Sequence, residues 1–213
     1  SVPAAVPLTF AHPAAAIPLE RLLGRAGVVS ALVVGSVVPD LHYFLPLPVS
    51  REATHSPAGL LWFCLPVGLL AYQAFHRALA QPLLALLPDA WQARLVPLLE
   101  ARARRPAPVW AVAVSILAGA LTHVTWDLFT HGTDSVVEAL PVLGVRLAIV
   151  SGYPLYVHRL LLHGSSLLGV ALLARWSLRW LRQAEPGADV PTPRLRPALR
   201  AAILAGLVAA ATR

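Results

Sequence analysis

Residues 107–130, APVWAVAVSILAGALTHVTWDLFT, decide the fold of this chain. The run is long enough to cross the hydrocarbon core of a bilayer, which is ~30 Å thick and takes about 20 helical residues. Near its C-terminal end it carries His123 and Asp127, which lie one helical turn apart. We therefore expect a membrane-spanning helix with polar side chains gathered toward one end.

The composition of the whole chain supports a membrane protein. Hydrophobic residues make up 57% of the 213 residues and charged residues only 13%, whereas charged residues are about a quarter of ordinary soluble domains. The mean hydropathy is +0.68. A chain of this length has too little interior to bury so much apolar surface. The composition excludes a disordered chain and a disulfide-stapled secreted domain, and it argues against a soluble enzyme.

Other apolar runs extend this interpretation to the rest of the chain. Residues 57–75 and 155–178 are two more predicted spans, and residues 81–105 read as an amphipathic surface segment. Residues 28–38 are too short to cross a bilayer, so residues 13–38 are predicted to form a partial helical hairpin. We found no alternating strand pattern. The predicted fold class is all-α: a polytopic membrane helix bundle with four full or near-full spans and a short N-terminal helical hairpin.

The distribution of proline and glycine divides the chain. Residues 1–182 are predicted to be the membrane helical domain that holds the polar cluster. Residues 183–197 read as a Pro-rich linker, and residues 198–213 as a short apolar helix.

The formal charge of +7, from 17 basic and 10 acidic residues, predicts a membrane topology rather than a nucleic-acid partner. The basic residues are arginines that flank the apolar spans, and positive loops stay on the cytoplasmic side. The loop after the first span and the linker region are rich in arginine. The loops 40–56 and 131–158 are poor in arginine and are predicted to lie outside.

Histidines and carboxylates recur at the predicted outer side. His123, Asp127 and His131 are spaced i, i+4, i+8, which places them near one helix face, and a His and a carboxylate one turn apart can share a metal ion. The alternative is a capped helix end with hydrogen-bonded histidines. Taken alone, each remaining group also has an ordinary interpretation, as a loop turn or a helix N-cap. These groups are His12, Asp40 with His42, and Arg51-Glu52-Ala53-Thr54-His55-Ser56.

The coincidence of these groups on one side of the bilayer favours a divalent-metal site. Unpaired polar groups near hydrocarbon are costly, and a shared cation lowers that cost. His158 and His163 are expected on the same side, and His76 is expected apart from the cluster. The predicted ligands are His12, Asp40, His55, His123 and Asp127, with zinc as the expected metal.

The same residues carry a resemblance to a known family. The stretches PLTFAHPAAAIPL, SALVVGSVVPDLHYF, GALTHVTWDLFTHG and PLY…HGSSLLG resemble a bacterial integral-membrane family known as domain of unknown function 4184, over about residues 6–182. More loosely, the chain is similar to membrane-bound metal-dependent hydrolases, through His12, Pro39–Asp40, Arg51 with Thr54–His55–Ser56, and His123 with Asp127. That pattern has a second Asp where this chain has His42. The resemblance implies a bacterial inner (cytoplasmic) membrane protein.

Two functions follow as hypotheses. The first is a metal-dependent hydrolase that acts on an amphiphilic phosphoester or other ester at the outer leaflet, with membrane lipid as a partner. Its metal would activate water; His131, Glu52 or His42 would serve as general base or supporting group, and Arg51 would hold an anionic headgroup. The second is a non-catalytic membrane protein, either a metal- or proton-handling permease or a scaffold. The gathering of polar groups at one side favours the first.

Overall fold

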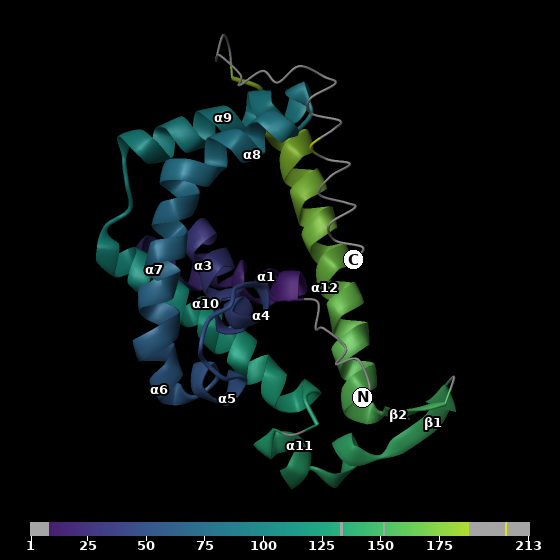
Figure 1. Ribbon diagram of the computed structural model, residues 1–213. Coiled ribbons are helices and arrows are strands. Elements are labelled where there is room, and N and C mark those ends of the chain that lie inside the picture. Colours follow the sequence, from purple (N-terminus) through teal and green to yellow (C-terminus); the bar gives the residue numbers. More distant parts are fainter. Residues whose placement is uncertain (1–8, 133, 151, 188–202, 204–213) are drawn as a thin grey trace. The chain divides into compact units, whose positions relative to one another are not determined.

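The computed structural model describes residues 9–132, 134–150, 152–187 and 203 (Figure 1). The chain divides into two compact units. The first contains Ser1–Tyr72 and Pro108–Trp176, and the second contains Gln73–Ala107 and Ser177–Arg213. The polar cluster belongs entirely to the first unit.

The first unit begins with a series of short helices. They are η1 (Thr9–Ala11), α1 (Pro13–Ala16), α2 (Leu19–Leu23), η2 (Gly24–Ala26), α3 (Val29–Gly35), η3 (Val38–Asp40) and α4 (Leu41–Phe44). A bend of 116° separates Leu19–Ala26 from Val29–Phe44, the geometry of a broken span or a re-entrant loop. This part of the chain therefore turns back on itself within a few residues.

The remaining elements are longer. After α5 (Arg51–Thr54), one helical stretch runs through α6 (Pro57–Gly59), the π-helix η4 (Leu60–Cys64), α7 (Leu65–Ala74), the π-helix η5 (Phe75–Leu79) and α8 (Ala80–Leu86). It is followed by α9 (Asp89–Arg104) and α10 (Val109–Thr130). The last elements are α11 (Ser135–Ala139), η6 (Pro141–Gly144), β1 (Arg146–Val150), β2 (Tyr153–Tyr156) and α12 (Val157–Gln183).

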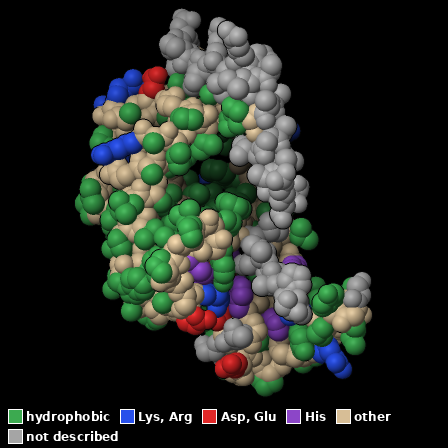
Figure 2. Space-filling view, viewed as in Figure 1, with side chains coloured by type: hydrophobic (Ala, Val, Ile, Leu, Met, Phe, Trp, Pro, Cys, Tyr) green, Lys and Arg blue, Asp and Glu red, His purple; other side chains and the backbone are tan. Residues whose placement is uncertain are grey.

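Three of these helical stretches are long and apolar enough to cross a membrane: Pro57–Leu86, Val109–Thr130 and Val157–Gln183. The bent pair raises the number to four if it counts as one span. In both units, large hydrophobic side chains such as Leu61, Trp110, Leu167 and Leu178 are exposed, and hydrophobic side chains cover much of the face seen in Figure 2. Exposed apolar surface of this extent indicates association with a membrane.

Two sequence predictions need correction here. The first apolar helix does not end at residue 75 but continues through His76 and Arg77 to Leu86. The fold is mostly helical, in line with the predicted class, but β1 and β2 pair as an antiparallel hairpin where the sequence showed no strand pattern. The second correction concerns the number of spans: four full or near-full spans besides the N-terminal hairpin were predicted, and the described residues hold three helices of that length besides the bent pair. Residues 136–150 hold part of α11, η6 and β1, the first strand of the β-hairpin. The missed signal is Ser151-Gly152 between two β-branched or aromatic runs; Gly152 has φ +83°, which favours glycine.

The contact between α3 and α10 sets the position of the site. Gly35 and Gly119 face each other's helices so closely that a Cβ at Gly119 would lie 2.3 Å from the Leu32 carbonyl oxygen. A Cβ at Gly35 would lie 2.2 Å from the Ile116 carbonyl oxygen. Below the polar cluster, Val38, Phe63, Cys64 and Ala120 form a buried apolar core. The two glycines therefore bring the end of α3 against the middle of α10.

The second unit is smaller. In it α8 packs on α9, the Arg94 Nε donates a hydrogen bond to the Ala184 carbonyl, and the Gly187 amide donates to the Ala93 carbonyl. His76 belongs to this unit, as part of η5. Apart from Ile203, the predicted short helix 198–213 lies outside the described residues, as does most of the predicted linker 183–197.

Candidate metal centre

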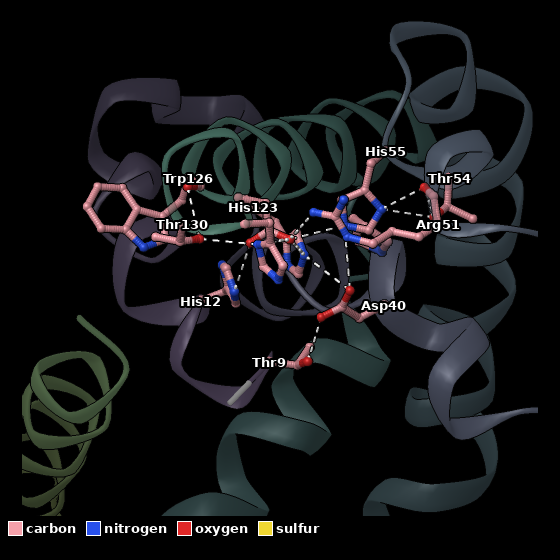
Figure 3. A network of polar contacts seen from close by, with 12 residues as sticks. Thr9, His12, Asp40, Arg51, Thr54, His55, His123, Trp126 and Thr130 are labelled. Atoms are coloured by element: carbon pink, nitrogen blue, oxygen red, sulfur yellow. Dashed lines mark hydrogen bonds and ion pairs between the residues drawn. The ribbon is translucent and has the colours of Figure 1, made fainter. Parts of the chain in front are cut away.

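Three segments that are distant in the sequence bring four ligand-type side chains together. The C-terminal half of α10 presents His123 and Asp127 from successive turns, η3 ends at Asp40, and His55 follows α5. One nitrogen or oxygen atom from each of these residues lies within 4.8 Å of the other three. Figure 3 shows Asp40, His55 and His123 pointing toward a common centre. We refer to these four residues as the ligand group.

The separations within the ligand group match shared coordination better than hydrogen bonding. His55 Nε2 lies 3.5 Å from Asp40 Oδ1 and 3.3 Å from Asp127 Oδ2. His123 Nε2 lies 3.5 Å from the same two oxygens. Two atoms bound to the same tetrahedral ion at about 2.0–2.2 Å lie about 3.3–3.6 Å from each other.

Each of the four residues also has one buried polar atom without a hydrogen-bond partner among the described residues. Asp40 and His123 are 0% exposed and Asp127 is 1% exposed. Among the described residues, Asp40 Oδ1, His55 Nε2, His123 Nε2 and Asp127 Oδ1 lack a hydrogen-bond partner. Buried polar atoms are rarely left in this state, and a cation between Asp40 and the two imidazoles would satisfy Asp40 Oδ1 and both Nε2 atoms. The Asp127 oxygen nearest to the imidazoles is Oδ2, which already accepts a hydrogen bond from Arg51.

The opposite nitrogens of both imidazoles are held by backbone carbonyls. His123 Nδ1 lies 2.8 Å from the Ser36 carbonyl oxygen, and His55 Nδ1 lies 3.1 Å from the Arg51 carbonyl oxygen. A carbonyl can only accept, so each Nδ1 donates its proton. In the neutral form of each ring the lone pair is then on Nε2, the atom directed at the ligand group. This is the usual second-shell arrangement of a metal-bound histidine.

Hydrogen bonds also hold the two carboxylates, at the far oxygen of Asp40 and at the oxygen of Asp127 that faces the imidazoles. The Thr9 hydroxyl donates to Asp40 Oδ2 at 2.6 Å, which leaves Oδ1 facing the imidazoles. Arg51 Nη2 donates to Asp127 Oδ2 at 3.1 Å, and the same guanidinium makes two hydrogen bonds with Asp134, at 2.9 and 3.0 Å. These bonds hold the pKa of Arg51 above its usual value against the effect of burial. Both terminal nitrogens of Arg51 are thus bonded to carboxylates of the protein. The sequence hypothesis had given Arg51 an anionic headgroup as its partner instead.

His12, the fifth predicted ligand, lies beside the ligand group. Its ring stacks on His123 with centroids 3.8 Å apart, and its Nε2 is 3.7 Å from Asp127 Oδ1. Burial, together with the neighbouring His123, lowers the pKa of His12 to about 4, although Asp127 and Asp40 act in the other direction. His12 is therefore neutral at pH 7.

Two of the three predicted catalytic residues lie at the edge of the cluster. His131 Nδ1 is 3.5 Å from Asp127 Oδ2, and burial lowers the pKa of His131. The His42 ring meets the His55 ring edge-on at 6.4 Å; its Nδ1 bonds to the Pro39 carbonyl, while its buried Nε2 has no partner among the described residues. The third, Glu52, is exposed on α5, where hydrogen bonds to its own backbone amide and to Ser50 lower its pKa. No contact described for Glu52 reaches the ligand group.

The ordinary capping roles coexist with the cluster. Ser50 caps α5 by accepting from the Ala53 amide, and Ser56 caps α6 by accepting from the Gly59 amide. His158 is buried with its Nδ1 against the Leu143 carbonyl, and His163 is exposed. Sequence reasoning missed Thr9 and Asp134, whose roles appear only through their contacts with Asp40 and Arg51. Asp134 follows His131 by three residues in the sequence, so its closeness to the polar end of α10 was a signal that could have been used.

Fold and site together define a mostly helical protein with three helices of membrane-spanning length and a buried His–Asp group that could hold a metal ion. The chain belongs to the family described as Domain of unknown function (DUF4184), which it matches over residues 6–212. The match extends past residue 182, so residues 183–212, which the resemblance over residues 6–182 did not cover, also belong to the family's domain. No curated protein and no solved structure matches the chain.

Proposed function

We propose that this protein is a membrane metallohydrolase that holds one divalent ion, with zinc as the first choice, at Asp40, His55, His123 and Asp127. The observation that carries the proposal is the convergence of four ligand-type side chains, one atom of each within 4.8 Å of the others. Asp40 Oδ1 and both histidine Nε2 atoms are buried without a hydrogen-bond partner among the described residues, and each histidine is held through Nδ1 by a backbone carbonyl. Two carboxylates and two neutral imidazoles would balance the charge of a divalent ion.

The proposed reaction is hydrolysis of a phosphoester or other ester of an amphiphilic molecule at the outer leaflet of the bacterial inner membrane. A bound divalent ion supplies an activated water and polarises the ester oxygen. Hydrolysis also requires that one proton leave the water and that one reach the departing alcohol. His131 suits this task because it is half-buried and lies 3.5 Å from Asp127, and because its lowered pKa keeps it neutral at pH 7.

Arg51 supports the site from the side. Its hydrogen bonds to Asp127 and Asp134 position the Asp127 carboxylate. The membrane-length helices α10 and α12, which belong to the same chain as the site, favour an amphiphilic substrate over a freely soluble one.

The test has two parts. Detergent-purified protein should contain about one equivalent of divalent metal, and Asp127→Asn should lose it, while Glu52→Gln, on the exposed side of α5, should keep it. The metal-loaded protein should hydrolyse a long-chain phosphoester or carboxyl ester, with activity removed by a chelator and restored by Zn²⁺. Metal in wild type without hydrolysis of either ester class would favour the non-catalytic alternative, and equal metal in Asp127→Asn would remove the site.

A further inference from the structure

A second feature of the first unit lies directly beside the ligand group. A partly open cavity of about 220 Å³ is bounded by the N-terminal helices, α10 and α12. Ala14 and Ala15 of α1 line one side, and Leu162, Leu168 and Leu172 of α12 line another. We call this space the α1–α12 cleft.

The cleft exists because small residues stand where its walls meet. Gly169 of α12 faces Ala11, and a Cβ at Gly169 would lie 2.9 Å from the Ala11 carbonyl oxygen. Alanines on α1 leave the space that larger side chains would fill. The cleft is therefore a product of particular residues rather than of loose packing.

The lining is mostly apolar. Trp126 and Ser165 also line the cleft, but the Trp126 indole N–H donates to Ser165 Oγ at 3.1 Å, and Ser165 in turn donates to the Leu162 carbonyl. These polar groups are thus already bonded to one another. An apolar space with few available polar groups holds hydrocarbon in preference to water.

One residue joins the cleft to the ligand group. His12 lines the cleft, stacks on His123 and lies 3.7 Å from Asp127 Oδ1. In Figure 3 its ring lies against that of His123. A molecule seated in the cleft would thus be separated from the proposed metal by a single side chain.

We infer that the α1–α12 cleft binds one hydrocarbon chain of the substrate, so that the substrate class is an alkyl or acyl ester whose polar end meets the metal beside His12. This inference rests on the proposed function. The volume is below the ~300–1,000 Å³ of sites that hold drug-sized ligands, which suits a chain rather than a ring system. Two walls of the cleft belong to α10 and α12, both long enough to span a membrane, so a lipid chain has direct access from the bilayer.

The experiment uses dodecyl phosphate with a photoreactive group near the end of its chain, bound to the metal-loaded full-length protein. Cross-links should fall on cleft residues of α1 and α12. Excess dodecyl phosphate should compete, and butyl phosphate should not. Ala14→Leu and Ala15→Leu should each weaken binding by about tenfold, because the new side chain displaces roughly two methylenes of the ligand.

The matched control is Ala171→Leu, an exposed position on α12 that does not line the cleft. It should bind the probe as wild type does, and all three variants should keep their metal. If Ala14→Leu or Ala15→Leu fails to fold, Leu172→Ala provides the test, since a larger cleft should shift preference severalfold toward a branched chain. The inference would be overturned if Ala14→Leu and Ala15→Leu bound the probe as wild type does, or if Leu172→Ala kept the wild-type chain preference. It would also be overturned if butyl phosphate competed as well as dodecyl phosphate.

The outcomes separate this inference from the proposed function. Competed cross-linking in the cleft without ester hydrolysis would keep the chain site and remove the hydrolase. Hydrolysis with the same KM for long- and short-chain esters would keep the hydrolase and remove the chain site. Cross-links between the α12 helices of two copies, in place of probe cross-links, would show a second copy in the cleft and overturn the chain site.

Discussion

Two buried histidines on apolar helices, His123 of α10 and His158 of α12, look alike in the sequence and differ in the structure. Both rings are held through Nδ1 by a backbone carbonyl, of Ser36 and of Leu143 respectively. The other nitrogen of His123 faces the carboxylates Asp40 and Asp127, whereas the His158 Nε2 lies over Gly132 and its ring stacks on Tyr156. A carbonyl anchor is therefore common to both, and the carboxylates Asp40 of η3 and Asp127 of α10 make only His123 of the two a candidate metal ligand.

The largest effect should come from removing a ligand. Asp127→Asn and His123→Ala should each lower metal affinity by more than about 100-fold, because each removes a direct bond rather than a supporting contact, and supporting contacts alone are worth about 10–100-fold. His158→Gln should leave metal affinity within about twofold. Competition titration against a chelator measures this. Equal losses in His123→Ala and His158→Gln would erase the distinction between the two helices.

The second largest effect should be a loss of folding stability at acidic pH. The pKa of His12 is about 4 in the folded protein against 6.5 in an unfolded chain. Below pH 6.5 the unfolded state takes up a proton that the folded state refuses, so stability should fall as pH drops from 6.5 to about 4 and then level off. The limit set by this shift is about 3 kcal/mol.

Chemical denaturation of the metal-free protein across this pH range checks the His12 prediction. His12→Asn should show a smaller fall in unfolding free energy between pH 6.5 and pH 4 than wild type. Parallel curves for the two proteins would contradict it.

The third prediction compares glycines on the same two helices. Gly119→Ala should cost about 1–3 kcal/mol of stability, because its Cβ would lie 2.3 Å from a carbonyl oxygen of α3 and the helices must separate. Gly164→Ala on α12, with nothing within 4 Å of the new Cβ, should be neutral or stabilise by up to about 1 kcal/mol. Thermal unfolding in detergent measures both; a stable Gly119→Ala with full metal content would show that close packing is not what assembles the site.

The smallest effect should follow from Thr9→Val. This change removes the hydroxyl that bonds Asp40 Oδ2 at 2.6 Å but keeps the shape of the side chain. Metal affinity should fall by about tenfold, at the weak end of second-shell effects. Thr122→Val is the matched control, because that hydroxyl donates to the Gly119 carbonyl within α10, away from the ligand group. A Thr9→Val variant with the affinity of wild type would place Asp40 outside the metal's coordination.

Much of the arrangement was accessible from the sequence. Hydropathy alone located the three long apolar helices, and the i, i+4 spacing of His123 and Asp127 placed both on one face of α10. The shared-cation argument also named Asp40 and His55, and the structure places both within 4.8 Å of His123 and Asp127. It also included His12, which lies beside the group. The hydrolase hypothesis separately named Glu52 as a catalytic candidate, and Glu52 is exposed. The free-energy cost of unpaired polar groups near hydrocarbon identifies residues on one side of a bilayer. It does not rank those residues by their distance from a common centre.

The sequence by itself determined which residues are apolar, which can bind a metal and how they repeat along a helix, because these properties follow from side-chain chemistry and helical period. Only the tertiary structure decided which lone pairs meet. That decision depends on the close contact of Gly35 and Gly119 and on the carbonyls of Ser36 and Arg51, which set the imidazole tautomers. Contacts between segments so distant in the chain leave no periodic trace, because each depends on a single backbone approach.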